Sequence, residues 1–324
     1  MDRIDAKLAG IERQRHAVLP TPVHELPALS SLSGCRVFCK RDDLTGFGFG
    51  GNKARKLDFL IADAMLLGCD TLLAVGANQS NFCRMVAAYG SAHEMAVHLV
   101  LGGEKPAVPT GNLRLDHLLG ASCHHVDGSA WDAWEASAAV WEEALRRAGR
   151  TVYRMPIGGS TVVGSLGYVA AMAEILDDEQ RLGVPFDAII LASSSAGTQA
   201  GLVVGQSIAQ WPGQVLGFSV AKDRERQQQD VLDLAQETAG RLGASIDGRS
   251  IWVDDSYLGD GYAHHTQACE DAVRFFARKC GIFLDYVYTG KAAAGLLASL
   301  RAGRFAPGSA ILFLHTGGNA ELFA

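Results

Sequence analysis

Features of secreted, membrane-spanning and nucleic-acid-binding proteins are missing from this sequence. The first residues, Met1 to Lys7, lack the basic-then-apolar order of a secretory signal, and no run of about 18 apolar residues occurs that could cross a bilayer. Lysine and arginine form no long runs, and the formal net charge is −6. The sequence therefore predicts no membrane partner and no nucleic-acid partner.

The seven cysteines form no Cys-x-x-Cys pair, and their number is odd. This spacing does not predict a disulfide framework, so we expect a reduced protein of the cytoplasm. The adjacent pairs His124–His125 and His264–His265 lack Cys, Asp or Glu at ligand spacing, and neighbouring side chains on a strand point apart. We therefore predict no metal site, and we interpret Cys83 as a buried structural thiol rather than a nucleophile.

The sequence does contain enough apolar material for a large core, with 48% hydrophobic residues among its 324. Strands are predicted at 37–39, 71–75, 97–101, 188–191, 215–220 and 311–314. Helices are predicted at 56–67, 131–147 and 267–279, and the acidic runs 142–143 and 177–179 are interpreted as solvated. This alternation predicts an α/β protein of two lobes with largely parallel sheets, and a ligand site at the carboxyl ends of the strands.

The first of three glycine-rich loops, residues 46–53, ends at a lysine. Its glycines match Gly-x-Gly-x-x-Gly loosely, but residues 40–45 separate them from the preceding strand, which argues against a nicotinamide dehydrogenase. The Gly-Lys-Ser/Thr of a P-loop is absent. The amine of Lys53 stands beside other cations, which can poise it to bond with an aldehyde. On spacing alone, we favour a solvated, basic start of a helix.

The other two glycine-rich turns follow predicted strands directly. Residues 193–198 read Ser-Ser-Ser-Ala-Gly-Thr before a helix, where free N–H groups suit one phosphate, although an ordinary tight turn is the alternative. Residues 315–318 read His-Thr-Gly-Gly and place a hydroxyl at the same sheet edge. A nucleophilic lysine together with a cradle for one phosphate suggests pyridoxal phosphate, which carries an aldehyde and a phosphate.

Six motifs resemble, in order, those of the D-cysteine desulfhydrase / 1-aminocyclopropane-1-carboxylate (ACC) deaminase family, which includes cysteate sulfo-lyases. They are KRDD at 40–43, GGNKARK at 50–56, QSN at 79–81, SAGT at 195–198, YTGK at 288–291 and HTGG at 315–318. The resemblance implies a two-domain fold type II pyridoxal-phosphate enzyme, similar to the tryptophan synthase β fold, and a homodimer. Its large, cofactor-binding domain would comprise 1–53 and 160–324, and its small domain 54–159.

The resemblance also implies roles for the matching residues. The cofactor would be bound by Lys53, Asn52, Asn81, Ser195, Ala196, Gly197, Thr198 and Thr316. The substrate would be bound by Gln79, Ser80, Asn81 and Thr289. Catalysis would be carried out by Lys53, Ser80, Tyr262 and Tyr288. Of these, Lys53 would bond covalently to the cofactor and then move the Cα proton, either alone or with Ser80, and Asn81 would lie beside the phenolic oxygen of the cofactor.

Two positions bear on the reaction type. The family's deaminases carry a glutamate and a leucine where this chain has Thr289 and Thr316, the pattern of the desulfhydrases. A neutral hydroxyl makes the cofactor ring a weaker electron sink than a carboxylate would, which suffices when a β-substituent leaves readily. We therefore predict β-elimination, with D-cysteine giving pyruvate, ammonia and sulfide.

The alternatives are L-cysteate, another β-substituted alanine, an ACC deaminase, or a non-catalytic cofactor-binding protein. A sulfonate substrate would want an extra cation, for which Arg84 is the candidate. The chain departs from the desulfhydrases at Phe82, Cys83 and Met85, where they carry His, a variable residue and, after the arginine, Gln. This change of polarity near the site leaves the natural substrate and its enantiomer open.

Overall fold

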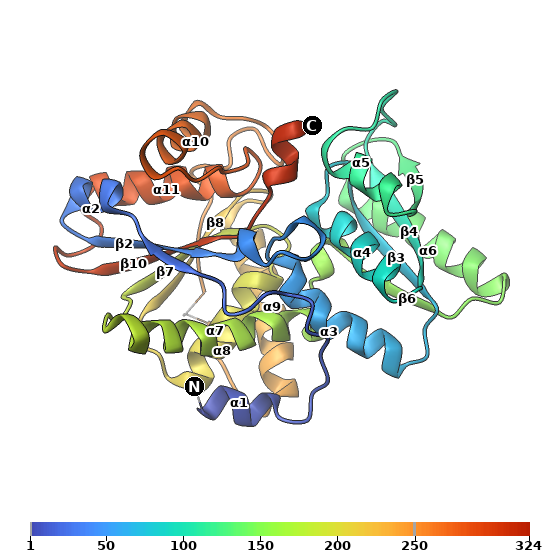
Figure 1. Cartoon of the computed structure of the whole chain (residues 1–324), viewed down its shortest axis with the longest axis horizontal. Helices are drawn as coiled ribbons and strands as arrows, with labels where there is room; N and C mark the ends of the chain where they lie inside the picture. The colour runs from blue at the N-terminus through green and yellow to red at the C-terminus, as the bar shows by residue number, and fades with distance from the viewer. Residues whose placement is uncertain (1, 249–250) are drawn as a thin grey trace.

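Two sheets, each covered by helices, make up the computed structural model, which describes residues 2–248 and 251–324 (Figure 1). The larger sheet has the strand order β1-β2-β10-β7-β8-β9. Its strands are β1 (Val23–Glu25), β2 (Arg36–Arg41), β7 (Ala188–Ser193), β8 (Gln214–Ser219), β9 (Trp252–Asp254) and β10 (Ala310–His315). Strand β1 pairs antiparallel with β2, and the other neighbours are parallel.

The smaller sheet is parallel throughout and has the order β5-β4-β3-β6. Its strands are β3 (Thr71–Ala77), β4 (Ala96–Gly102), β5 (Ser122–Val126) and β6 (Val152–Met155). The larger sheet thus takes its strands from 23–41 and 188–315, and the smaller one from 71–155. The domain boundaries at 53/54 and 159/160 stay a prediction.

Helices cover both faces of the larger sheet, with α10 and α11 above it and α7 and α8 below it in Figure 1. The helices are α1 (Asp2–Leu8), α2 (Pro27–Ser33), α3 (Lys53–Leu66), α4 (Asn81–Ala92), α5 (Gly111–Leu118), α6 (Trp131–Arg147), α7 (Val162–Leu182), α8 (Gly197–Ala209), α9 (Arg224–Arg241), α10 (Gln267–Cys280) and α11 (Thr289–Arg301). In β7, Ile189 and Leu191 pack in one core while Ala188 and Ile190 pack in the other. Alternate residues of a strand point to opposite faces, so a strand covered on both sides is apolar throughout.

The predicted α/β class is confirmed, and each of the six predicted strands and three predicted helices has a counterpart. The short strands β1, β5, β6 and β9 were not predicted, because three to five residues carry little periodicity. In β5, His124 hydrogen-bonds to His98 while His125 hydrogen-bonds to Asn78, so the adjacent rings do point apart. In the described part of the chain, no helix combines the length and apolar character needed to cross a membrane.

Glycines set the distance between the helices below the larger sheet. A Cβ on Gly201 of α8 would lie 2.3 Å from the carbonyl oxygen of Ser165 in α7, and a Cβ on Gly167 would lie 2.3 Å from that of Arg55 in α3. Both contacts are with backbone, which cannot rotate away as a side chain can. The three helices therefore approach at distances that only glycine permits.

We expect Gly201→Ala to lower the free energy of unfolding by about 1–3 kcal/mol, because its methyl group must push α7 and α8 apart. The matched control is Gly240→Ala in α9, where no heavy atom lies within 4 Å of the added Cβ. That change should raise stability by up to about 1 kcal/mol through helix propensity. Chemical denaturation measures both, and equal effects from the two variants would contradict the packing argument.

Candidate active site

A cavity of about 770 Å³, partly open to solvent, lies where β3, β7 and β10 end. Among the described residues it is lined by Asn52, Lys53, Gly76, Ala77, Ser80, Asn81, Phe82, Trp131, Trp134, Ile157, Gly158, Ala192, Ser193, Ser194, Ser195, Ala196, Thr198, Gln199, Tyr262, Tyr288, Thr316, Gly317 and Gly318. Both sheets contribute to this wall. The structure thus places the cavity at the carboxyl ends of parallel strands, as predicted.

Lys53 is the first residue of α3 and reaches into the cavity. Its Nζ donates to Oδ1 of Asn52 at 3.0 Å, while Nδ2 of Asn52 donates to the Thr198 hydroxyl at 3.1 Å. Burial, and then the nearby Arg84 guanidinium, lower the pKa of Lys53 to about 8. With that pKa, roughly a tenth of the amine is neutral at pH 7, hundreds of times more than for an ordinary lysine.

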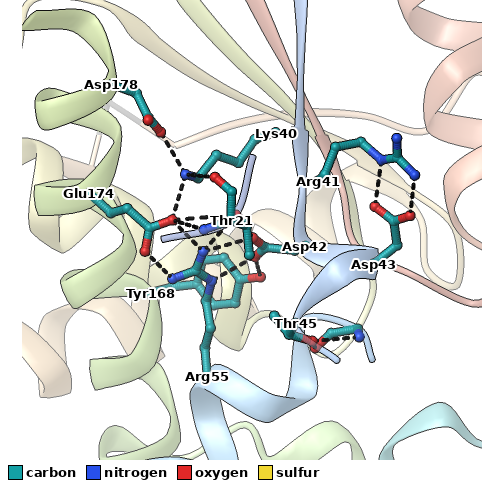
Figure 2. A network of polar contacts seen from close by, with 11 residues as sticks. Thr21, Lys40, Arg41, Asp42, Asp43, Thr45, Arg55, Tyr168, Glu174 and Asp178 are labelled. Carbon is teal, nitrogen blue, oxygen red and sulfur yellow. Dashed lines mark hydrogen bonds and ion pairs between the residues drawn. The ribbon is translucent and has the colours of Figure 1, made fainter. Parts of the chain in front are cut away.

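The start of α3 is buried, so our interpretation of it as a solvated basic helix was wrong. Arg55 and Lys56 are 3% and 1% exposed. Arg55 makes paired hydrogen bonds of 2.8 Å to both carboxylate oxygens of Asp42, and paired bonds of 2.9 Å to Glu174 (Figure 2). A guanidinium with two bidentate carboxylate partners is held in one orientation. Lys53, two residues earlier, is thereby positioned.

The same network continues to Lys40, whose Nζ lies 2.6 Å from Asp178 and 2.5 Å from Glu174 (Figure 2). We predicted a solvated acidic run at 177–179, which is wrong for Asp178, because its side chain is 4% exposed. Burial alone would raise the pKa of Glu174, but the contacts with Arg55 and Lys40 lower it to about 2. The network therefore ties β2, α3 and α7 together around the base of the site.

The turn after β7 forms a cradle of small groups. Ala196 takes a positive φ of 69° before the first residue of α8, Gly197. The Ser195 hydroxyl accepts from Ser160 at 2.9 Å, and the amide of Gly197 donates to Ser160 at 3.3 Å. A Cβ on Gly197 would lie 2.5 Å from Nζ of Lys56. Hydroxyls, a helix N-terminus and an ammonium group thus meet in one place.

Lys56 is a residue of this cradle that the sequence analysis missed. Its Nζ donates to Gly158 O at 3.0 Å and to the Ser160 hydroxyl at 3.1 Å. No carboxylate of the described residues lies within ion-pair distance, and burial together with Lys53 lowers the pKa of Lys56 well below its usual value. The sequence contained a signal, since this lysine ends the motif at 50–56. The spacing of residues alone does not show that its side chain points toward the turn at residue 195.

The opposite side of the cavity carries Ser80, Tyr262 and Tyr288. Ser80 caps α4 by accepting from the amide of Cys83 at 3.1 Å, so its own O–H remains free to donate. The hydroxyls of Tyr262 and Tyr288 hydrogen-bond to each other. Burial raises the pKa of Tyr262 to about 12, although the bond to Tyr288 opposes this, and it raises that of Tyr288 further. Both phenols are therefore protonated near neutral pH.

Trp131 closes this side of the cavity and was not predicted as a site residue. Its ring meets that of Tyr262 edge-on at 5.6 Å, and Nζ of Lys222 lies 5.0 Å from its centroid. Trp131 begins α6, beside the smaller sheet, whereas Tyr262 and Lys222 follow strands of the larger one. The contact therefore joins the two halves at the edge of the cavity. Only the general preference of aromatic residues for ligand sites could have suggested it.

Ten of the thirteen predicted site residues line the cavity, and Gly197, Gln79 and Thr289 do not. The Gln79 side chain turns to Thr110 and Asn112, and the Thr289 hydroxyl donates to Asp285 at 2.6 Å. Their predicted contacts with the substrate stay a prediction.

Arg84 also lies outside the lining, because it donates to the carbonyls of Gly48 and Gly50 and to the side chain of Asn112. Our candidate for a sulfonate-binding cation was therefore wrong.

Comparison with known proteins identifies the family. Residues 15–317 match the family described as pyridoxal-phosphate dependent enzyme. The chain belongs to that family. A D-cysteine desulfhydrase of Salmonella typhi is 37% identical over 312 residues, which cover 94% of this chain and 93% of the relative. A Pyrococcus furiosus protein with the provisional name 1-aminocyclopropane-1-carboxylate deaminase is 38% identical over 323 residues, covering 99% and 96%.

The fold agrees with this assignment. The crystal structure of an ACC deaminase homologue superposes with a TM-score of 0.94 at 36% identity, covering 100% of this chain and 97% of that one. The threonine deaminase of T.th. shares the fold, with a TM-score of 0.66 at 20% identity over 98% of each chain. The protein is a pyridoxal-phosphate-dependent lyase of fold type II, in the D-cysteine desulfhydrase / ACC deaminase family.

The cavity of this lyase fits its cofactor. Lys56 is a buried amine without a carboxylate partner in the described chain, and a bound anion beside it would favour its charged form. A Cβ on Gly158 would lie 2.2 Å from the Ser195 hydroxyl, so the cradle tolerates only glycine there. The cradle offers the donors that one phosphate group needs, and the amine of Lys53 in the same cavity is a group of the kind that bonds to an aldehyde.

We expect Glu174→Gln to lower the free energy of unfolding at pH 7 by about 3–5 kcal/mol, because it leaves Arg55 and Lys40 short of a buried partner. A carboxyl whose pKa falls from 4.5 to about 2 on folding stabilises the protein above pH 4.5 and stops doing so as pH falls toward 2. Denaturation at several pH values should therefore show the wild type and the variant converging in acid.

The control for this prediction is Glu143→Gln, an exposed residue that lies 3.9 Å from Arg147. Its loss should change stability by less than about 0.5 kcal/mol at any pH. A Glu174→Gln variant as stable as this control at pH 7 would show that the network does not hold α3.

Proposed function

We propose that this lyase catalyses β-elimination from D-cysteine, giving pyruvate, ammonia and sulfide with the uptake of one water. The observation that carries the proposal is the character of the cavity wall. Its described lining residues include serine, threonine and tyrosine hydroxyls but neither Asp nor Glu. A ring nitrogen that faces a hydroxyl makes the bound cofactor a weaker electron sink than one that faces a carboxylate. That strength suits a substrate whose β-thiol leaves readily.

Thr316 belongs to this wall, whereas Thr289 lies behind it. Thr316 lines the cavity, and its hydroxyl makes no hydrogen bond within the described ranges, so it is free to meet a ligand. Thr289 instead engages Asp285, whose carboxylate also accepts from the amides of Val287 and Tyr288 at 2.9 and 2.6 Å. Asp285 is thus saturated by donors behind the wall. This placement supports elimination over cyclopropane opening.

This cavity suits a sulfonate substrate such as L-cysteate less well than it suits a thiol such as D-cysteine. Lys53 is the one cation among the described lining residues, and it is committed to the cofactor. Lys222 lies over Trp131 and pairs with Asp230, while Lys56 belongs to the phosphate cradle. A cavity without a spare cation supports a thiol as the leaving group, with sulfite release as the alternative outcome.

The proposed roles follow from what each group can donate or accept. When bound, pyridoxal phosphate supplies the electron-withdrawing ring that stabilises negative charge at Cα. Lys53, with its lowered pKa, takes the Cα proton, and the free O–H of Ser80 donates to the substrate. Tyr262 and Tyr288, whose hydroxyls hydrogen-bond to each other, give a proton to the departing sulfur in this proposal.

We propose further that the protein is a cytoplasmic homodimer of sulfur amino-acid degradation. All seven cysteines are free thiols, which suits a reducing compartment. Exposed apolar side chains gather at the end of α3, where Leu66 and Leu67 are 71% and 63% exposed, and a second subunit would cover surface of this kind.

The experiment that tests the function is a product assay with the purified protein and added pyridoxal phosphate. The substrates are D-cysteine, L-cysteine, L-cysteate, β-chloro-D-alanine, D-serine and ACC. We expect pyruvate and sulfide from D-cysteine at the highest kcat/KM. Sulfite from L-cysteate would replace the proposed substrate but keep the elimination, whereas ketobutyrate from ACC would overturn the argument from the cavity wall.

The role of Lys53 is tested by the visible absorption that the cofactor acquires when it bonds to a lysine. We expect Lys53→Ala to abolish this band and the elimination activity. The matched control is Lys56→Ala, three residues along the same helix, which should keep the band at saturating cofactor but weaken cofactor binding about tenfold or more, as expected for a lost charge-assisted hydrogen bond. A band that survives in Lys53→Ala would rule out this lysine.

A further inference from the structure

We propose that Arg84 and Asn112 fix the direction of the Asn81 side-chain amide, so that its NH2 group and not its carbonyl oxygen faces the active-site cavity. Neither Arg84 nor Asn112 lines the cavity, so both act as positioning residues through Asn81. The inference depends on the proposed function in one respect: the ligand that faces Asn81 is the cofactor together with its substrate.

The chain of contacts starts at a group that can only donate. The guanidinium of Arg84 is 2% exposed and donates from Nε to Oδ1 of Asn112 at 2.8 Å. Its other nitrogens donate to the carbonyls of Gly48 and Gly50. Burial lowers the pKa of Arg84 to about 10, which leaves it a cation at neutral pH. A guanidinium has no acceptor, so the end of Asn112 that faces it must be the carbonyl oxygen.

The second contact of Asn112 confirms the same direction independently. Its Nδ2 donates to the backbone carbonyl of Gln79 at 3.0 Å, and a carbonyl can only accept. The same Nδ2 lies 3.1 Å from Oδ1 of Asn81. Asn112 is completely buried, so no bulk solvent competes for these bonds. With a cation at one end and a carbonyl at the other, the side chain cannot be reversed without losing both contacts.

Asn81 therefore accepts a hydrogen bond from Asn112, and only its carbonyl oxygen can accept one. Its Nδ2 has no partner within residues 2–248 and 251–324, while the residue lines the cavity beside Ser80. An amide whose oxygen is engaged behind the wall presents two N–H donors in front of it. Such donors stabilise an oxygen anion, which is the state of the cofactor's phenolic oxygen that the family resemblance places near Asn81.

The alternative arrangement shows why the direction matters. A carbonyl oxygen in place of the NH2 group would repel an oxygen anion and favour its protonated state. Replacing a hydrogen-bond donor by an acceptor beside the phenolic oxygen should shift the titration midpoint of the bound cofactor by at least about one pH unit. The sequence-distant pair Arg84 and Asn112 would therefore set the pH at which the bound cofactor changes its protonation.

The test is a pH titration of the visible absorption of the bound cofactor in Asn112→Asp. The aspartate has the shape of asparagine and still accepts from Arg84, but its second oxygen accepts where Nδ2 donated. Asn81 must then turn its NH2 group toward residue 112 and its oxygen toward the cavity. We expect the titration midpoint to rise by about one pH unit or more. A midpoint that matches the wild type would overturn the proposal.

Two further variants distinguish the effect of the Asn81 amide direction from the effect of an added charge and from a loss of structure. Gln79→Glu adds the same charge at a side chain that already accepts from the amide of Asn112 at 2.8 Å, and should leave the midpoint in place. Asn112→Ala frees Asn81 to adopt both directions, and should raise the midpoint by less than Asn112→Asp does. If Asn112→Asp does not fold, Asn112→Ala alone carries the test, and an unchanged midpoint there contradicts the proposal.

An equal rise in Gln79→Glu and Asn112→Asp would also overturn it, because charge alone would then explain the effect. The titration requires no substrate. A protein that releases no pyruvate from D-cysteine but shows the expected midpoints would therefore contradict the proposed reaction and support this inference.

Discussion

The guanidinium of Arg55 sits in a buried position between two carboxylates, and the geometry of the site depends on that pairing. Arg55 bonds to Asp42 after β2 and to Glu174 in α7, while its own helix begins with Lys53. Moving Lys53 would require α3 to shift, and a shift would break several charge-assisted bonds between largely buried groups at once. The network thus holds the amine of Lys53 in position, although none of its residues lines the cavity.

Buried basic side chains near the cavity differ in their partners. A side chain with carboxylate partners holds the fold together, whereas one without them is available to a ligand. Arg55 has carboxylate partners, whereas Lys56 has only neutral oxygens and Lys53 only the amide of Asn52. Charges that the protein leaves unbalanced raise the local potential and attract an anionic ligand. The cofactor's phosphate and the substrate's carboxylate supply such charge, so binding completes an electrostatic arrangement that the chain alone leaves open.

The sequence predicted the α/β class, the sites of six strands and most of the cavity lining, because apolar periodicity and glycine-rich turns are local features. It could not predict that Lys56 turns to the phosphate cradle or that Asp178 is buried beside Lys40, since both depend on contacts over a hundred residues away. Trp131 was missed for the same reason, and Asn112 was missed because its partners Gln79, Asn81 and Arg84 lie about 30 residues earlier, in or beside a different helix. Gln79, next to Ser80 in a site motif, faces away from the cavity because its amide bonds to Asn112 and Thr110.

The close approach of Gly167 to the backbone of Arg55 has a consequence for how the family can diverge. Helix α3 cannot slide along α7 by a residue, because the next position would bring a side chain where only hydrogen fits. The turn after its other end has open space within this chain, since a Cβ on Gly68 would meet no atom within 4 Å. A change of chain length after Leu66 should therefore disturb the position of Lys53 less than a change of length in the segment that precedes Lys53.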